Sequence, residues 1–214
     1  MTTEKSTKRA YNSTRRQESA LQTRQGIAQA ALQLFQQRGY RGASIDAIAE
    51  AAAVAPETIY ATFGNKREVL HYILDTAVGG DEAPVRVIDR PEVQAMLHHP
   101  DPYQIAAGLS EAMSRTWERA APVFAILSEA AKTEPVLADL RHRIYQERLE
   151  NMRLTAHSMA TRKPLRVSEA QAAEIIWTLT SPEMFLLLTR ERGWSREQFA
   201  AWLKDSIIRM LFVD

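Results

Sequence analysis

Residues 44–64 contain two short stretches in which apolar side chains recur at helical spacing, separated by a run of small residues. The first stretch follows Ser44, a residue type that caps helix N-termini. Its apolar face consists of Ile45, Ile48, Ala49 and Ala52. The second stretch opens at Pro56 and supplies Ile59 and Phe63 to a core. Proline suits the first position of a helix, because the N–H that it lacks would have no hydrogen-bond partner there. Two such helices joined by a tight turn predict a helix-turn-helix.

Further helices are predicted on both sides of this motif. Ser19 and Gln22 have the spacing of a capping box, and the helix that they open ends at Gly39, since glycine tolerates the left-handed conformation that closes a helix. Asn65 and Glu68 have the spacing of a second capping box, so a helix follows there as well.

Every later segment of substantial length also has helical spacing, and no β-hairpin signal is present. The predicted helices cover residues 91–98, 102–119, 122–132, 135–160, 168–190 and 195–212, with a kink or a restart at Pro182. We therefore expect an all-α fold with an N-terminal three-helix helix-turn-helix domain and a larger helical C-terminal domain. The expected division is a basic flexible tail over 1–18, the helix-turn-helix domain with its connecting helix over 19–78, and the second domain over 79–214.

Charge is unevenly distributed along the chain. Residues 1–41 hold eight Lys and Arg against two Asp and Glu, whereas residues 75–214 hold seventeen against twenty. A basic end of this kind is typical of binding to a polyanion, because clustered cations release the counterions condensed on phosphates. A solvated tail would give the same pattern, so charge alone leaves both interpretations open.

Several function classes are excluded or disfavoured by the sequence. No apolar stretch approaches the roughly 18 residues that a bilayer span needs, so we expect no membrane contact. The basic N-terminus has no apolar signal region and the chain has no cysteine, which favours the cytoplasm. No catalytic motif is present, and the histidines lack the spacing of metal ligands, namely His71, His98, His99, His142 and His157. We expect no enzyme activity, no metal and no cofactor.

The chain from Thr23 to Leu74, and above all from Ile45 to Lys66, resembles the DNA-binding domain of TetR/AcrR-type transcriptional regulators. The residues that carry the resemblance are Leu34-Phe35, Arg38-Gly39-Tyr40, Ile48-Ala49, Ala52, Val54, Thr58-Ile59-Tyr60, Phe63, Lys66 and Leu70. The resemblance implies an all-helical homodimer with a C-terminal ligand-binding and dimerisation domain. It also implies a repressor that leaves its operator when a small molecule binds. Ala53 departs from the pattern where the turn usually has glycine, and Ala55 where serine or threonine often contacts DNA.

In a helix-turn-helix, the second helix places its N-terminal residues in the major groove of double-stranded DNA. The candidate DNA-binding residues are Ser44, Ala55, Pro56, Glu57, Thr58, Tyr60, Thr62 and Lys66. Tyr60 and Lys66 are suited to phosphate contacts, and Ala55 to an apolar contact such as a thymine methyl group. Glu57 has two interpretations, since it can accept from a cytosine amino group or favour the helix dipole. Ser44 serves as a cap in either case.

The C-terminal half carries large apolar residues at helical intervals. Such residues form a packed core by default, but as a set they can line a pocket for a mostly apolar effector. The candidate pocket residues are Met113, Trp117, Phe124, Leu127, Tyr145, Met152 and Trp177. The last helices carry more apolar surface than one chain usually hides, which predicts a two-fold interface. Its candidate residues are Phe185, Leu188, Phe199, Trp202, Leu203 and Met210. An effector-independent DNA-binding protein and an activator are the alternative functions.

Overall fold

The computed structural model describes residues 4–83 and 85–213, and within them the side chains from residue 18 onward. The chain divides into two compact units between Ile73 and Leu74. In the described residues, regular structure is helical throughout, apart from one isolated bridge between Leu165 and Phe212. The predicted all-α class is confirmed. None of the helices in these residues is both long and apolar enough to span a bilayer.

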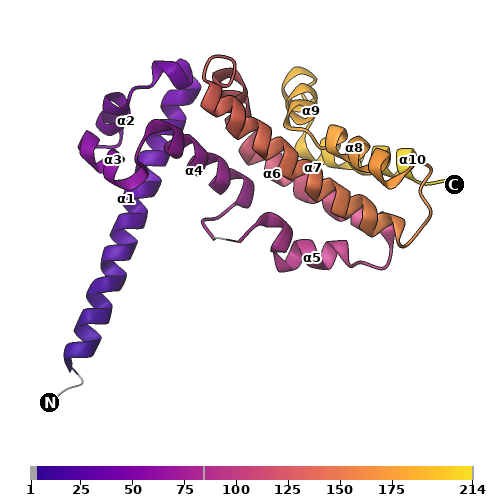
Figure 1. Ribbon diagram of the computed structural model, residues 1–214, viewed down its shortest axis with the longest axis horizontal. Helices are drawn as coiled ribbons and strands as arrows, with labels where there is room; N and C mark the ends of the chain where they lie inside the picture. The colour runs from indigo at the N-terminus through magenta and orange to yellow at the C-terminus, as the bar shows by residue number, and fades with distance from the viewer. Residues whose placement is uncertain (1–3, 84, 214) are drawn as a thin grey trace. The chain divides into compact units, whose positions relative to one another are not determined.

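The first unit contains the predicted helix-turn-helix and its flanking helices (Figure 1). Its helices are α1 (Glu4–Gly42), α2 (Ile45–Ala51), α3 (Pro56–Phe63) and most of α4 (Lys66–Gly79). Its core is formed by side chains from all four, among them Ile27, Leu34, Phe35, Ile48, Ile59, Phe63, Val69 and Leu70. The predicted domain boundary, between residues 78 and 79, lies at the very end of α4, whereas the compact units divide near its middle, between Ile73 and Leu74.

The start of α1 differs from the prediction. The helix runs from Glu4 straight through Ser19, so the predicted capping box with Gln22 is wrong. The carbonyl of Ser19 instead accepts a hydrogen bond from the Thr23 hydroxyl at 2.9 Å, inside the helix. Residues 4–18 contain no glycine or proline and include five Lys and Arg, two Glu, one Gln and one Ala, residues that favour helix, so nothing in this segment stops the helix. Residues 1–3 of the predicted tail, and the basic side chains as far as residue 17, lie outside the description.

The end of α1 agrees with the prediction. At Gly39 the backbone leaves the helical region, with φ 71° and ψ 168°, and a short helical turn follows to Gly42. A positive φ is costly for residues with a Cβ atom, so glycine is the residue that this change of direction requires.

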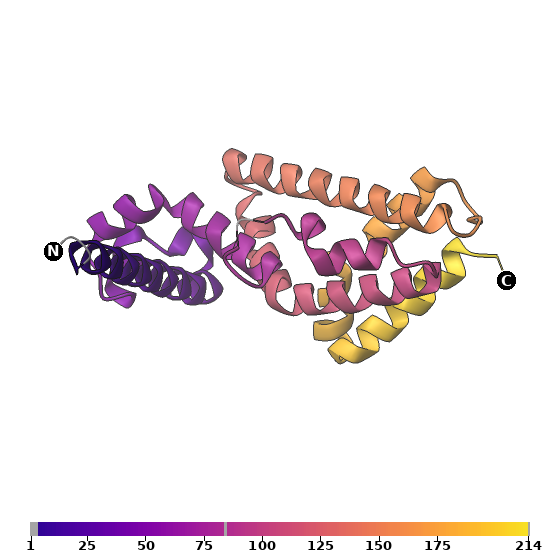
Figure 2. The same ribbon diagram turned by 90° about the horizontal axis from the view of Figure 1, so that it is seen from below.

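The second unit is a bundle in which α6 lies between α7 and α10 (Figure 2). Its α-helices are α5 (Pro91–Leu97), α6 (Pro102–Ala130), α7 (Pro135–Ala160), α8 (Glu169–Leu179), α9 (Pro182–Leu186) and α10 (Arg196–Leu211). A short 3₁₀ turn, η1 (Val87–Asp89), precedes α5, and a turn of π-helix, η2 (Leu187–Glu191), lies between α9 and α10. The helix restart at Pro182 agrees with the prediction, and Ser181 caps it through the N–H of Met184.

The predicted break at Pro122 is wrong, because α6 continues through this proline. Its neighbours Ala120, Ala121, Val123 and Phe124 are buried. Keeping these four side chains in the core outweighs the lost backbone hydrogen bond, as tertiary packing often overrides local propensity.

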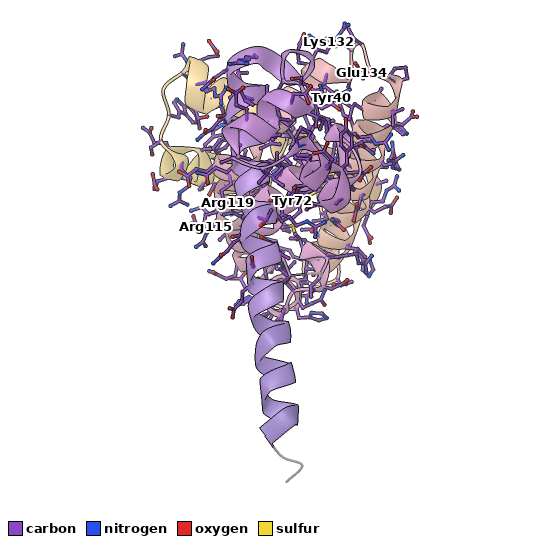
Figure 3. All side chains as sticks on the ribbon, turned by 90° about the vertical axis from the view of Figure 1, so that its left-hand side faces the viewer. Tyr40, Tyr72, Arg115, Arg119, Lys132 and Glu134 are labelled. Carbon is purple, nitrogen blue, oxygen red and sulfur yellow. The ribbon has the colours of Figure 1, made fainter. Side chains whose placement is uncertain are left out.

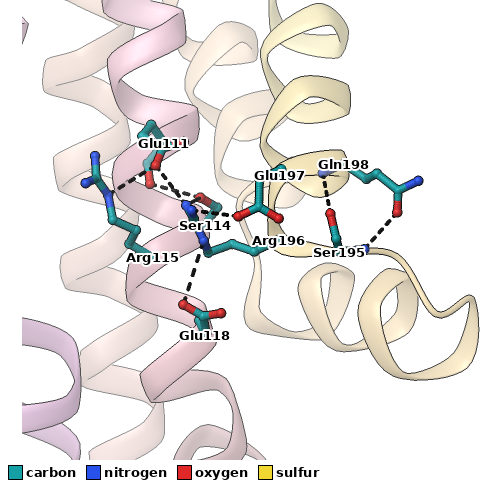
Figure 4. A network of polar contacts seen from close by, with 8 residues as sticks. All are labelled: Glu111, Ser114, Arg115, Glu118, Ser195, Arg196, Glu197 and Gln198. Atoms are coloured by element: carbon teal, nitrogen blue, oxygen red, sulfur yellow. Dashed lines mark hydrogen bonds and ion pairs between the residues drawn. The ribbon is translucent and has the colours of Figure 1, made fainter.

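Arg196, the first residue of α10, fastens this helix to α6 (Figure 4). Its guanidinium lies 2.8 Å from the carboxylate of Glu111 and 3.8 Å from that of Glu118. Ser195 precedes it and forms a capping box with Gln198. The polar contacts thus fix the start of α10, while its apolar face fills the core.

Candidate nucleic-acid interface

The turn between α2 and α3 sets the angle of the helix-turn-helix. The N–H of Val54 bonds to the carbonyl of Ala49 at 3.0 Å, and that of Ala53 bonds to the carbonyl of Glu50 at 3.1 Å. These two bonds are the pair that closes a helix in a Schellman motif, in which the residue after the C-cap is left-handed and usually glycine. Here Ala53 occupies this position with φ 53°. The turn therefore has the geometry that the sequence predicts, with a strained alanine.

We expect the variant Ala53→Gly to raise the free energy of unfolding by roughly 0.5–1 kcal/mol. Glycine adopts the left-handed conformation without strain, and this gain exceeds the additional conformational entropy that glycine loses on folding. Ala51→Gly is the matched control, since this residue lies in helical conformation at the end of α2, where glycine destabilises. Urea unfolding followed by circular dichroism measures both. A loss of stability in Ala53→Gly equal to that in the control would contradict the assigned strain.

One face of α3 is held in the core and the other faces outward. Ile59 and Phe63 are buried, whereas Glu57 is exposed and Tyr60 is 54% exposed. Ala55 is the N-cap and supplies no side-chain acceptor to the first turn. An outward helix face bearing a hydroxyl and a carboxylate can form hydrogen bonds with phosphates and base edges.

The eight predicted DNA-binding residues all lie in the first unit: six belong to α3 or its N-cap, Ser44 caps α2 and Lys66 begins α4. Ser44 caps α2 by accepting the N–H of Ala47 at 3.1 Å, which confirms its structural role. Thr62 donates its hydroxyl proton to the carbonyl of Thr58 at 2.7 Å, so that proton is engaged within the helix. Pro56 occupies the first turn of α3, as predicted. The DNA contacts of these residues stay predictions.

Lys66 has a structural role that sequence analysis did not reveal. Its ammonium donates to the carbonyls of Tyr40 and Ala43, each at 2.9 Å. It also lies 4.3 Å from the centre of the Tyr40 ring, which Figure 3 labels. These contacts tie the start of α4 to the segment between α1 and α2. The Lys66 ammonium, for which a phosphate contact is predicted, is thus already hydrogen-bonded to these two carbonyls.

Arg24 also has a structural role that was not predicted from the sequence. Its guanidinium lies 5.2 Å from the ring centre of Phe63 and 5.1 Å from that of Tyr72, the latter labelled in Figure 3. It therefore connects α1 to the end of α3 and to α4 through cation–π contacts. Its spacing on the predicted helix gives no sign of these partners, because they lie far along the chain.

The predicted pocket residues form a connected aromatic cluster in the second unit. The ring centres of Trp117 and Phe124 are 5.2 Å apart, those of Phe124 and Tyr145 are 6.2 Å apart, and those of Tyr145 and Trp177 are 5.7 Å apart. Leu127 and Met152 are buried, whereas Met113 is half-buried. A pocket of about 250 Å³ lies beside this cluster, and Phe124 is the member of the predicted set that lines it.

The predicted dimer residues are divided between core and surface. Phe185, Phe199 and Leu203 are buried inside the unit, where the first two rings pack edge to face at 5.0 Å. They fill the core and offer almost no surface to a second copy, which corrects their placement in an interface. Leu188 and Trp202 are half-buried, and Met210 is 46% exposed. The predicted interface therefore rests on these last three residues.

Comparison with known proteins gives a match to one family model and matches to solved structures. Residues 27–73 match the family model for bacterial regulatory proteins of the tetR family. NalD, the secondary repressor of the MexAB-OprM efflux pump in Pseudomonas aeruginosa, is similar in structure, with a TM-score of 0.68 and 20% identity over 91% of this chain and 99% of that chain. PfmR, a TetR family transcriptional regulator from Thermus thermophilus, has a TM-score of 0.65 and 23% identity over 86% and 97%. No curated protein matches the sequence.

Proposed function

We propose that this chain, whose residues 27–73 match the family model for bacterial regulatory proteins of the tetR family, is a sequence-specific DNA-binding transcriptional regulator. We further propose that it is a repressor released from its operator by a small molecule. The observation that carries the proposal is the arrangement of α3, which buries Ile59 and Phe63 and turns Glu57 and Tyr60 outward. A helix held in this way can enter the major groove, which is about 12 Å wide.

The proposed partners are double-stranded operator DNA, a second copy of the chain and a small, mostly apolar effector. A two-fold dimer would place two α3 helices in successive turns of the groove, about 34–36 Å apart. Leu188, Trp202 and Met210 retain apolar surface for such a dimer. Effector binding in the second unit would change the separation of the two α3 helices, so that both could no longer dock.

Selection of bound fragments from randomised duplex DNA tests the DNA-binding proposal. We expect enrichment of a two-part site whose halves are about one helical turn apart, with an affinity that falls steeply as salt increases. Titration of the resulting complex with small molecules then tests release. Failure to enrich any duplex would refute the DNA-binding function. An operator complex that no effector dissociates would favour the alternative of effector-independent binding, and reporter expression would separate repression from activation.

We expect Glu57→Gln to change which sequences are enriched, because a carboxylate that accepts from a cytosine amino group discriminates by about 1–3 kcal/mol at that base pair. Glu50→Gln is the matched control, since this exposed residue of α2 also loses one negative charge. Repeating the selection with both variants measures the effect. An unchanged preferred sequence in Glu57→Gln would assign this residue to the helix dipole instead.

A further inference from the structure

Arg148 is a cation on the inward side of α7, surrounded by aromatic rings. Its Cζ atom lies 5.5 Å from the ring centre of Trp117, 5.6 Å from that of Tyr145 and 5.2 Å from that of Trp177. These rings come from α6, α7 and α8, so the guanidinium sits where three helices of the second unit meet. A charge in such surroundings has lost most of its hydration and needs compensating partners.

The hydrogen bonds of Arg148 leave part of this guanidinium unsatisfied. Its Nη2 donates to the carbonyl oxygens of Trp177 at 2.8 Å and Thr180 at 3.2 Å. Nε and Nη1 are also buried, yet within the described part of the chain they have no hydrogen-bond partner. Burial lowers the pKa of Arg148 to about 10, so the side chain is still charged at neutral pH. Two buried nitrogens of this guanidinium, each of which bears N–H, thus have no hydrogen-bond acceptor among the described residues.

Glu183 is an acidic side chain whose charge acts on Arg148, where it favours the charged guanidinium and opposes the lowering of the pKa by burial. Its carboxylate accepts a hydrogen bond from the hydroxyl of Tyr145, whose pKa is raised to about 12 by burial and by this carboxylate. Glu183 forms no hydrogen bond with Nε or Nη1 of Arg148, which have no partner among the described residues. Arg141 adds a second cation, with its Cζ atom 5.0 Å from the centre of the Tyr145 ring. What the described residues do not supply is an acceptor that bonds directly to Nε and Nη1 of Arg148.

The pocket of about 250 Å³ lies on the other side of the same cluster. Phe124 and Glu183 line it, together with Ala125, Ser128, Glu129, Lys132, Pro182 and Leu186. Tyr145 connects pocket and guanidinium, since its ring packs against Phe124 while its hydroxyl bonds Glu183. Arg148 does not line this pocket, so a small molecule bound here would contact the Phe124 ring and would reach the guanidinium only if the Tyr145 ring moved. Aromatic rings around a charged group are typical of ligand sites.

We propose that Arg148 binds the carboxylate of a small apolar effector, whose hydrocarbon part packs against the rings of Trp117, Phe124, Tyr145 and Trp177. The proposal rests on the proposed function and specifies its effector as an apolar carboxylic acid. It also explains a cation at this position, because an arginine serving only to bond the carbonyls of Trp177 and Thr180 would need no unpaired buried nitrogens.

Binding of matched acids and amides to the full chain, without DNA, tests the proposal. The probes are 3-phenylpropanoate and hexanoate, each compared with its neutral amide, and intrinsic tryptophan fluorescence reports binding because Trp117 and Trp177 flank Arg148. We expect at least one carboxylate to bind about 10-fold or more tightly than its amide, since a charge-assisted hydrogen bond distinguishes them. Arg148→Gln is expected to abolish this preference.

Arg153→Gln is the matched control, because Arg153 lies on the same helix in an exposed ion pair with Glu150. It is expected to leave the preference unchanged. Arg148→Lys retains the charge and is expected to keep a preference at reduced affinity, which covers the case in which Arg148→Gln does not fold. No preference for either carboxylate in the unmodified chain, or a preference that persists in Arg148→Gln, would overturn the proposal and assign the free nitrogens to water. Operator binding is measured separately, so a chain that binds DNA without this preference refutes only the carboxylate site.

Discussion

Replacing Tyr60 by aspartate is expected to weaken binding to the selected operator by on the order of 100-fold or more. Tyr60 is 54% exposed on the outward face of α3, so the change costs little core packing. In the proposed complex its hydroxyl donates to a phosphate, and a hydrogen bond to a charged group contributes about 1.5–3 kcal/mol. A carboxylate at this position replaces that attraction with repulsion between like charges. Fluorescence anisotropy with labelled operator measures the loss.

Two further variants identify the cause of this effect. Tyr60→Phe removes only the hydroxyl and is expected to weaken binding about 10-fold on all sequences alike, because phosphate contacts carry no sequence information. Leu154→Asp adds the same charge at a 53% exposed site in the second unit and is expected to leave operator affinity unchanged. Circular dichroism verifies that all three variants keep their helices. Equal losses in Tyr60→Asp and Leu154→Asp would contradict a direct contact of Tyr60 with DNA.

Trp117→Ala is expected to reduce the free energy of unfolding of the second unit by about 3–5 kcal/mol. Trp117 is 2% exposed, and its ring packs edge to face on Phe124. Its indole N–H donates to the carbonyl of Thr180 at 2.6 Å, and its ring faces the guanidinium of Arg148. The variant therefore creates a cavity and removes one of the two side-chain hydrogen bonds that the carbonyl of Thr180 accepts. Thermal unfolding is expected to move down by on the order of 10 °C.

Trp194→Ala provides the comparison, because Trp194 is half-buried and packs mainly on Trp202, with ring centres 6.0 Å apart. We expect it to cost much less stability than Trp117→Ala, since part of its surface is already in water. Calorimetry of both variants gives the two values. If the two substitutions cost the same, Trp117 would not be the centre of the aromatic cluster that its contacts indicate.

Much of the first unit was predictable because its signals are local. A cap, a turn and a proline each act within a few residues, so Ser44, Pro56 and the left-handed position at Ala53 all appear where the sequence predicts them. The capping box at Ser19 failed for the same physical reason. A capping sequence ends a helix only if the preceding segment disfavours helix, and the residues before Ser19 do not.

The second unit was harder to predict, since the choice between core and surface depends on partners far along the chain. Phe199 and Leu203 have the spacing of an interface as well as that of a core, and only packing against the neighbouring helices places them inside. Arg148 carried a weaker signal. It lies three residues after Tyr145 and four before Met152, on the apolar stripe of a predicted helix. A charge on such a stripe indicates a buried polar site, but its spacing does not reveal its partners.

The helical class, the helix-turn-helix and the outward residues of α3 follow from the amino-acid sequence alone, because hydrophobic spacing and capping chemistry operate over one or two helical turns. Tertiary packing, by contrast, brings the Lys66 ammonium to the carbonyls of Tyr40 and Ala43 and places Arg148 among three rings, with two of its nitrogens lacking a hydrogen-bond partner among the described residues. Apart from the contact between Arg148 and Tyr145 within α7, those contacts join residues 23 to 32 positions apart in the chain, and they form only when packing brings the helices together.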